Sequence, residues 1–84
     1  MHVEFLGIPR ERAGISEVDI EAETLGQLLG TLALRFPALR GLITANRLDS
    51  SIAANLNGDV FVSDPKTALS AHDRLLLLSS DVGG

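Results

Sequence analysis

The sequence predicts an α+β domain in which a mixed five-stranded sheet carries one main helix packed on one face. Three observations support this fold class. Two apolar segments, residues 2–8 and 74–79, frame the chain and are typical of buried strands. One helical stripe of apolar residues lies between them. The pair Asn57-Gly58 predicts a tight turn between two further strands, because both residues tolerate positive φ.

The N-terminal part predicts two strands. Residues 2–8 are apolar on both faces, which favours a central position in the sheet. Pro9 is expected to end this strand, and residues 10–14 are expected to form a polar loop. Residues 16–22 alternate between apolar and acidic side chains, as in a half-buried edge strand. The acidic row either protects the edge from aggregation or serves as a docking stripe; it consists of Glu17, Asp19 and Glu21.

A capping box predicts where the main helix begins. Thr24 and Gln27 have the spacing at which a hydroxyl and an amide bond to the unpaired N–H groups of a first turn. Pro37 is expected to end the helix. Gly26 and Gly30 lie off the apolar stripe and either allow a close neighbour or are simply tolerated. The stripe consists of Leu25, Leu28, Leu29, Leu32 and Phe36.

The second half of the chain completes the predicted sheet. Residues 38–50 give no clear pattern. The other predicted elements are two strands joined by the Asn57-Gly58 turn, a single helical turn and the last strand: residues 51–56, 59–62, 67–70 and 74–79. This order of elements is that of the β-grasp, or ubiquitin-like, architecture, with the first and last strands side by side in mid-sheet. We expect residues 1–80 to form the domain and residues 81–84 a flexible C-terminal tail.

Composition narrows the classes of function. The formal net charge is −4 and the pI is 4.9, which argues against nucleic acid as a partner. The sequence contains no cysteine, so disulfides, thiolate metal sites and a cysteine nucleophile are excluded. No signal peptide and no long apolar run is found, and we therefore expect a cytoplasmic protein without membrane contact.

The chemistry-bearing residues do not predict an autonomous active site. His2 and His72 lack metal-ligand spacing, and the serines lack a Gly-x-Ser-x-Gly setting. No glycine-rich phosphate loop joins a strand to a helix. We expect neither catalysis by this chain alone nor a metal or cofactor bound by it.

The last residues of the sequence offer a different kind of chemistry. Gly83 and Gly84 have no Cβ, so they form a backbone ribbon of minimal cross-section. Together with Val82, which precedes them, they can enter a narrow channel to a partner's active site. Activation of the Gly84 carboxylate would make it an acyl donor. The alternative is an ordinary frayed end.

Strand parity suggests the partner surface. If Leu75 and Leu77 face the helix, Leu76 and Leu78 face outward next to the tail. Two outward leucines on a central strand are then a candidate docking patch, unless a loop covers them or the parity is reversed.

Taken together, these features resemble the ubiquitin-like sulfur-carrier family, which includes the small subunit of molybdopterin synthase and the thiamine-pathway sulfur carrier. The resemblance covers the whole chain. The features that carry it are residues 3–7, the Arg-Glu-Arg-Ala-Gly segment at 10–14, residues 35–37, Leu56-Asn57-Gly58 and Gly83-Gly84. The segment at 10–14 is similar to that of molybdopterin synthase small subunits.

The resemblance implies a mechanism. A partner of the ubiquitin-activating type, using ATP and Mg²⁺, adenylates Gly84. A sulfurtransferase then replaces AMP with sulfur, and a large synthase subunit uses the resulting thiocarboxylate, most directly in molybdenum cofactor biosynthesis. Three alternatives remain: a carrier for cysteine, thiamine, tRNA or secondary-metabolite sulfur, a modifier joined to lysines through Gly84, and a binding module with an inert tail.

Overall fold

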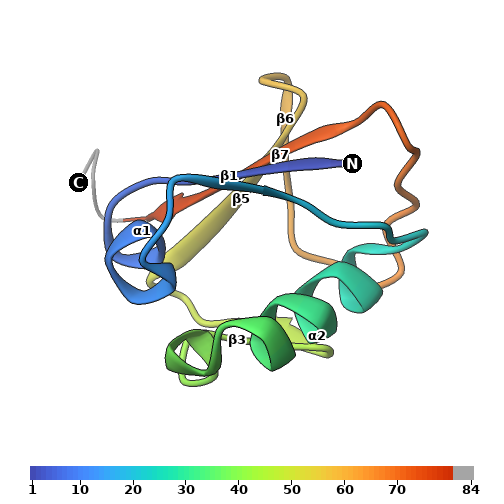
Figure 1. Cartoon of the computed structure of the whole chain (residues 1–84). Coiled ribbons are helices and arrows are strands. Elements are labelled where there is room, and N and C mark those ends of the chain that lie inside the picture. The colour runs from blue at the N-terminus through green and yellow to red at the C-terminus, as the bar shows by residue number, and fades with distance from the viewer. Residues whose placement is uncertain (81–84) are drawn as a thin grey trace.

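The computed structural model describes residues 1–80, in which five strands form one mixed sheet with the order β2-β1-β7-β5-β6 (Figure 1). The strands are β1 (His2–Phe5), β2 (Glu17–Asp19), β5 (Ile52–Leu56), β6 (Val60–Val62) and β7 (Arg74–Ser79). β1 and β7 pair in parallel at the centre, while the other neighbours are antiparallel. The predicted fold class and the central pairing of the first and last strands are confirmed. Residues 81–84, predicted as a tail, lie outside the described residues.

Helix α2 (Leu25–Arg35) covers one face of the sheet (Figure 1). Four leucines of the predicted stripe are fully buried, at 0% exposure: Leu25, Leu28, Leu29 and Leu32. They pack against the inward side chains of the central strands, such as Val3 and Leu77. Burial of each leucine stabilises the fold by about 1.5–3 kcal/mol, so this stripe contributes substantially to the stability of the core.

The predicted cap of α2 is present with one change. The Thr24 hydroxyl accepts a hydrogen bond from the Gln27 N–H at 3.2 Å. The Gln27 side-chain oxygen accepts from the Glu23 N–H at 2.9 Å, one residue before the Thr24 N–H of the usual capping box. The helix therefore begins where the sequence predicts. The Gln27 side chain of its first turn also holds the backbone of Glu23, the residue before the cap.

The predicted helical turn at residues 67–70 is wrong, because this segment is extended. Its backbone groups bond to the start of α2 instead of to each other. The Thr67 carbonyl accepts from the Leu25 N–H, and the Leu69 N–H donates to the Glu23 carbonyl, both at 2.9 Å. The first of these bonds satisfies a helix N-terminal N–H group that has no partner within the helix.

The segment 38–50, which shows no pattern in the sequence, folds as short elements beneath α2. They are a 3₁₀ helix η1 (Pro37–Leu39) and a two-stranded hairpin of β3 (Ile43–Thr44) and β4 (Arg47–Leu48).

The glycines of α2 allow this hairpin to approach closely. A Cβ atom at Gly26 would lie 2.8 Å from the Ala45 carbonyl oxygen, and one at Gly30 would lie 3.3 Å from the Ala45 Cβ. Of the two sequence interpretations, close packing against a neighbour is therefore the correct one.

The polar loop predicted at residues 10–14 is wrong: the chain forms helix α1 (Ile8–Ala13). Pro9 lies in the first turn, where its missing N–H costs nothing and its fixed φ suits a helix. Gly14 ends α1 with φ 79°, and its N–H donates to the Arg10 carbonyl at 2.9 Å. The first strand ends at Phe5, before the predicted end at residue 8, so Pro9 lies in the first turn of a helix instead of ending the strand.

The two other local predictions are confirmed. Asn57 (φ 59°) and Gly58 (φ 69°) form the turn between β5 and β6. β2 lies at the sheet edge with Glu17 and Asp19 exposed, but it spans residues 17–19 instead of the predicted 16–22, so Glu21 lies beyond its end. Within residues 1–80, none of the helices has the length and apolar character needed to cross a membrane.

Candidate functional site

The site is built on β7, which has a neighbouring strand on each side. On β1, Glu4 is opposite Leu76, and on β5, Ala53 is opposite Leu78. Six consecutive residues form β7, so the strand carries a regular alternation from Arg74 to Ser79.

The alternation places Leu76 and Leu78 on the sheet face that α2 does not cover. Leu75 and Leu77 are buried at 1% and 0% exposure, whereas Leu76 and Leu78 are both partly exposed. The first of the two predicted parities is therefore the correct one, and no described segment covers the two leucines completely. Their role in binding a partner stays a prediction.

Two exposed apolar residues extend this surface. Phe61 on β6 is 66% exposed and lies on the same face, because it pairs with Asn55, which in turn pairs with Leu76. Leu6, directly after β1, is 44% exposed. Together with Ala53 these residues form the outer-face patch, defined as Leu6, Ala53, Phe61, Leu76 and Leu78.

Sequence reasoning missed Phe61 and Leu6. Residues 60–62 are all apolar and carry no alternation of apolar and polar side chains, so the face on which Phe61 lies follows only from the pairing of β6 with β5. Large apolar side chains exposed on one face are typical of protein-interaction sites.

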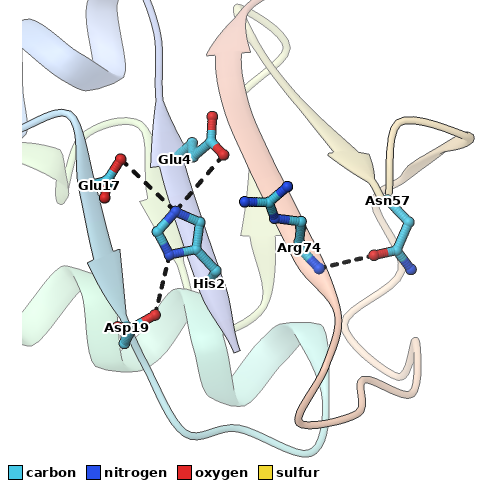
Figure 2. Close-up of polar contacts among 6 residues, drawn as sticks. All are labelled: His2, Glu4, Glu17, Asp19, Asn57 and Arg74. Atoms are coloured by element: carbon cyan, nitrogen blue, oxygen red, sulfur yellow. Dashed lines mark hydrogen bonds and ion pairs between the residues drawn. The ribbon is translucent and has the colours of Figure 1, made fainter.

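The other half of the same face is acidic and surrounds His2 (Figure 2). The His2 Nδ1 lies 3.1 Å from an Asp19 carboxylate oxygen, and its Nε2 lies 3.7 Å from Glu4 and 3.9 Å from Glu17. The two residues from β2 belong to the acidic row predicted for the edge strand. Among residues 1–80, no cluster of histidine and carboxylate side chains has an arrangement that would hold a metal ion.

The start of β7 is fixed by a polar network next to this region (Figure 2). The Asn57 side-chain oxygen accepts from the Arg74 N–H at 2.8 Å, and its amide donates to Asp73 at 3.0 Å. The other Asp73 oxygen accepts from the Ser70 N–H at 2.7 Å. The bonds from Asn57 and then from Ser70 hold the pKa of Asp73 below its usual value, so the network is strongest with an ionised carboxylate.

A separate groove of about 720 Å³ lies on the other side of the molecule, between α2 and the β3–β4 hairpin. Its walls include Gly26, Gly30, Leu34 and Ala45. Leu34 is 75% exposed. The structure thus presents apolar surface on two opposite sides, and only the outer-face patch is continuous with β7.

Three predicted site residues, Val82, Gly83 and Gly84, lie outside the described residues. β7 ends at Ser79, three residues before Val82 in the sequence. Leu76 and Leu78 of the outer-face patch therefore lie on the strand that precedes the predicted tail in the sequence.

The five-stranded mixed sheet, the single main helix and the apolar face beside the last strand define a ubiquitin-like protein of the β-grasp class. The chain belongs to the ThiS family: the model of that family matches residues 3–84. This result confirms the resemblance to ubiquitin-like sulfur carriers. Among curated proteins, none matches the sequence at the significance required.

Solved structures show the same fold. SAMP1 from Haloferax volcanii is 28% identical, with a TM-score of 0.75 and coverage of 100% of this chain and 98% of that one. Small archaeal modifier protein 1 from Methanosarcina acetivorans is 23% identical, with a TM-score of 0.78 and coverage of 99% and 94%. A chain of the Amycolatopsis orientalis BexX/CysO complex is 20% identical, with a TM-score of 0.80 and coverage of 99% and 98%.

Proposed function

We propose that this protein carries sulfur as a thiocarboxylate on Gly84. The observation that carries the proposal is a ThiS-family β-grasp domain whose central strand β7 precedes a Gly-Gly pair. The chain has no cysteine, so Gly84 is the one position in this sequence at which transferable sulfur would be held covalently.

The chemistry needs three steps on partner proteins. In the first, an oxygen of the Gly84 carboxylate attacks the α-phosphorus of ATP, which is bound with Mg²⁺ by an activating enzyme of the ubiquitin-activating type, and pyrophosphate leaves. In the second, the outer sulfur of a sulfurtransferase persulfide attacks the acyl carbon and AMP leaves. A thiol then cleaves the resulting S–S bond, forms a disulfide with the sulfurtransferase cysteine and leaves the thiocarboxylate.

The outer-face patch is the surface we assign to partner binding. Phe61 presents apolar area on the edge strand β6, and Leu76 presents apolar area on the central strand β7. Aromatic and aliphatic side chains of this kind dominate binding energy when a partner excludes water from them. The acidic flank, which consists of the residues around His2, suits basic side chains at the rim of the partner's interface. Its members are Glu4, Glu17 and Asp19.

As the final acceptor we propose the pterin precursor bound by a large molybdopterin synthase subunit, on the basis of the Arg-Glu-Arg-Ala-Gly sequence at residues 10–14. Carriage of sulfur to cysteine, thiamine, tRNA or a secondary metabolite is the alternative within the same class. Sulfur transfer from the thiocarboxylate to the precursor in the presence of the large subunit would support the molybdopterin assignment. Transfer only to another acceptor would contradict it.

A second function, protein modification, is favoured by one observation: two of the structural neighbours are named as archaeal modifier proteins. In this reaction a lysine amine attacks the adenylated Gly84 and AMP leaves, which forms an isopeptide bond. Trypsin would cleave this chain after Arg74, so tryptic peptides of a target that carry residues 75–84 on a lysine would establish it.

The proposal is tested by ATP–pyrophosphate exchange with a purified activating enzyme. The wild-type chain is expected to support exchange, and a variant ending at Val82 is expected to support none. A matched control, Gly41→Ala, adds a Cβ that would meet no other group within 4 Å and should exchange like the wild type. Equal exchange by the shortened variant would overturn the proposal.

A further inference from the structure

The last two described residues are each bonded to a different part of the fold. Ser79 ends β7 and is buried, at 5% exposure, although its side chain is polar. Ser80 is exposed. The hydroxyl contacts of the two serines lie outside the sheet ladder, and the proposed chemistry at Gly84 does not itself require them.

Ser79 joins β7 to helix α1. Its hydroxyl oxygen accepts a hydrogen bond from the Ile8 N–H at 2.9 Å. The residue at the helix cap, Gly7, has no side chain to make this bond, so Ser79 supplies the cap from another strand. Gly7 has φ 70°, and a Cβ atom there would lie 2.5 Å from the Ser79 hydroxyl oxygen. The glycine is therefore needed for the two segments to meet.

Ser80 joins the same end of β7 to the turn before β5. Its N–H donates to the Ser51 carbonyl at 2.7 Å, and its hydroxyl donates to the Ser50 carbonyl at 2.6 Å. That turn is itself held by Asp49, whose carboxylate accepts from the Ser51 N–H at 3.0 Å and the Ser51 hydroxyl at 2.6 Å. The acceptors for Ser80 are thus fixed in place.

We propose that Ser79 and Ser80 form a serine clamp that sets the point from which the chain departs toward Gly84. This inference rests on the proposed function. With the clamp closed, the segment that enters the activating enzyme begins at Asp81, and its four residues span at most about 14 Å. The clamp therefore fixes the separation between the outer-face patch and the reacting carboxylate.

The clamp acts on the step after docking. If Ser80 is released from its bonds to the turn before β5, its backbone becomes one more residue that must be ordered when the Gly84 carboxylate reaches ATP. The entropy lost in this ordering lowers the rate of adenylation in the docked complex. Docking uses Leu76 and Phe61, whose positions the change leaves intact. The expected signature is a kcat about tenfold lower with a KM that is nearly unchanged. Ser79 and Ser80 are positioning residues, since neither touches the reacting atoms.

The test uses a matched pair at one position in the whole chain. Ser80→Ala removes the hydroxyl that donates to Ser50, and Ser80→Thr keeps a hydroxyl there. Ser63→Ala, at another exposed serine, is the control for the loss of a hydroxyl. ATP–pyrophosphate exchange is measured at saturating ATP as the concentration of each variant is raised. Amide hydrogen exchange at Ser80 reports the clamp without any partner.

We expect Ser80→Ala to lower kcat about tenfold and to leave KM within about twofold of the wild-type value. The backbone amide of residue 80 should also exchange its hydrogen faster in this variant. Ser80→Thr should recover most of the rate, and Ser63→Ala should match the wild type. An unchanged kcat in Ser80→Ala, or an equal loss in Ser80→Thr, would overturn the clamp. If the proposed function is wrong, the wild-type chain itself supports no ATP–pyrophosphate exchange, which distinguishes that outcome from a failure of the clamp alone. The clamp's role in activation is then also wrong.

Discussion

Gly26 is a position in α2 where the lack of space for a side chain outweighs the low helix propensity of glycine. Alanine is favoured over glycine inside a helix by about 1 kcal/mol. In α2, however, a Cβ at this position meets the Ala45 carbonyl oxygen at 2.8 Å and Pro65 atoms at 3.1 and 3.2 Å. The hairpin beneath the helix therefore requires glycine here.

We expect Gly26→Ala to lower the free energy of unfolding by about 1–2 kcal/mol, because the overlap with backbone outweighs the gain in propensity. Chemical denaturation at neutral pH measures this change. Gly41→Ala, whose new Cβ meets nothing within 4 Å, should shift the same quantity by less than about 0.5 kcal/mol. An unchanged or raised stability of Gly26→Ala would show that the hairpin yields freely.

Asp73 makes stability depend on pH in the acid range. Its folded-state pKa is lowered, first by the Asn57 side chain and then by the Ser70 N–H, from the ordinary value of 3.8. A group with a lowered pKa stabilises the fold above the unfolded-state value, and this contribution is lost as the pH falls through the folded-state pKa. We therefore expect the free energy of unfolding to decline below about pH 4.

The variant Asp73→Asn removes this dependence, since an amide offers one acceptor and does not ionise. Compared with the wild type, it should be less stable at neutral pH and should lose less further stability as the pH is lowered. Urea denaturation at a series of pH values gives both quantities. Parallel curves for the two proteins would contradict the assignment to Asp73.

At the scale of the elements, the cap at Thr24 stabilises the first turn of α2, the helix that carries four fully buried leucines. Thr24→Ala removes the acceptor for the Gln27 N–H and should lower the free energy of unfolding by about 1 kcal/mol. Thr31→Ala makes the same substitution inside α2, where alanine propensity favours it, and should leave stability equal or slightly higher. Equal losses in both variants, measured by thermal or chemical denaturation, would argue against the cap.

The elements that could be predicted from the sequence are those with local signals. The leucine stripe of α2 and the Asn57-Gly58 turn follow from side-chain period and positive φ. Helix α1 was missed because a proline that ends a strand and one that starts a helix look alike until the next turn is known. The extended segment 67–70 depends on bonds to residues more than forty positions away, such as that between Thr67 and Leu25.

The candidate site was predictable to the same extent. Alternation alone indicates that Leu76 and Leu78 share a face, and burial of Leu75 and Leu77 selects which one. Phe61 could not be assigned to that face, since its position depends on strand pairing across β5. The serine clamp joins residues that are about seventy positions apart in one case, Ile8 and Ser79, and no local pattern predicts it.

At the scale of the whole molecule, the two faces of the sheet differ in what covers them. One face of the sheet is sealed by α2, and the other combines the outer-face patch with the acidic flank around His2. This arrangement predicts that partner recognition depends on the face of the sheet rather than on the groove beside α2.

Substitution of Leu76 by arginine should raise the KM of the activating enzyme for this protein about tenfold or more, because it places a charge at the centre of the patch. Leu34→Arg adds the same charge on α2, where the leucine is 75% exposed, and should leave KM within about twofold. Thermal denaturation of both variants checks that they are folded. A larger effect of Leu34→Arg would move the interface to the helix side.

The central claim is that Gly84 accepts sulfur, and intact-mass spectrometry tests it most directly. The protein is incubated with ATP, Mg²⁺, an activating enzyme and a persulfide-loaded sulfurtransferase, and a sample without ATP serves as the control. We expect a mass gain equal to the replacement of one oxygen by sulfur, found in the peptide that ends at Gly84 and absent without ATP. An unchanged mass, with an activating enzyme that supports pyrophosphate exchange on the same chain, would contradict it.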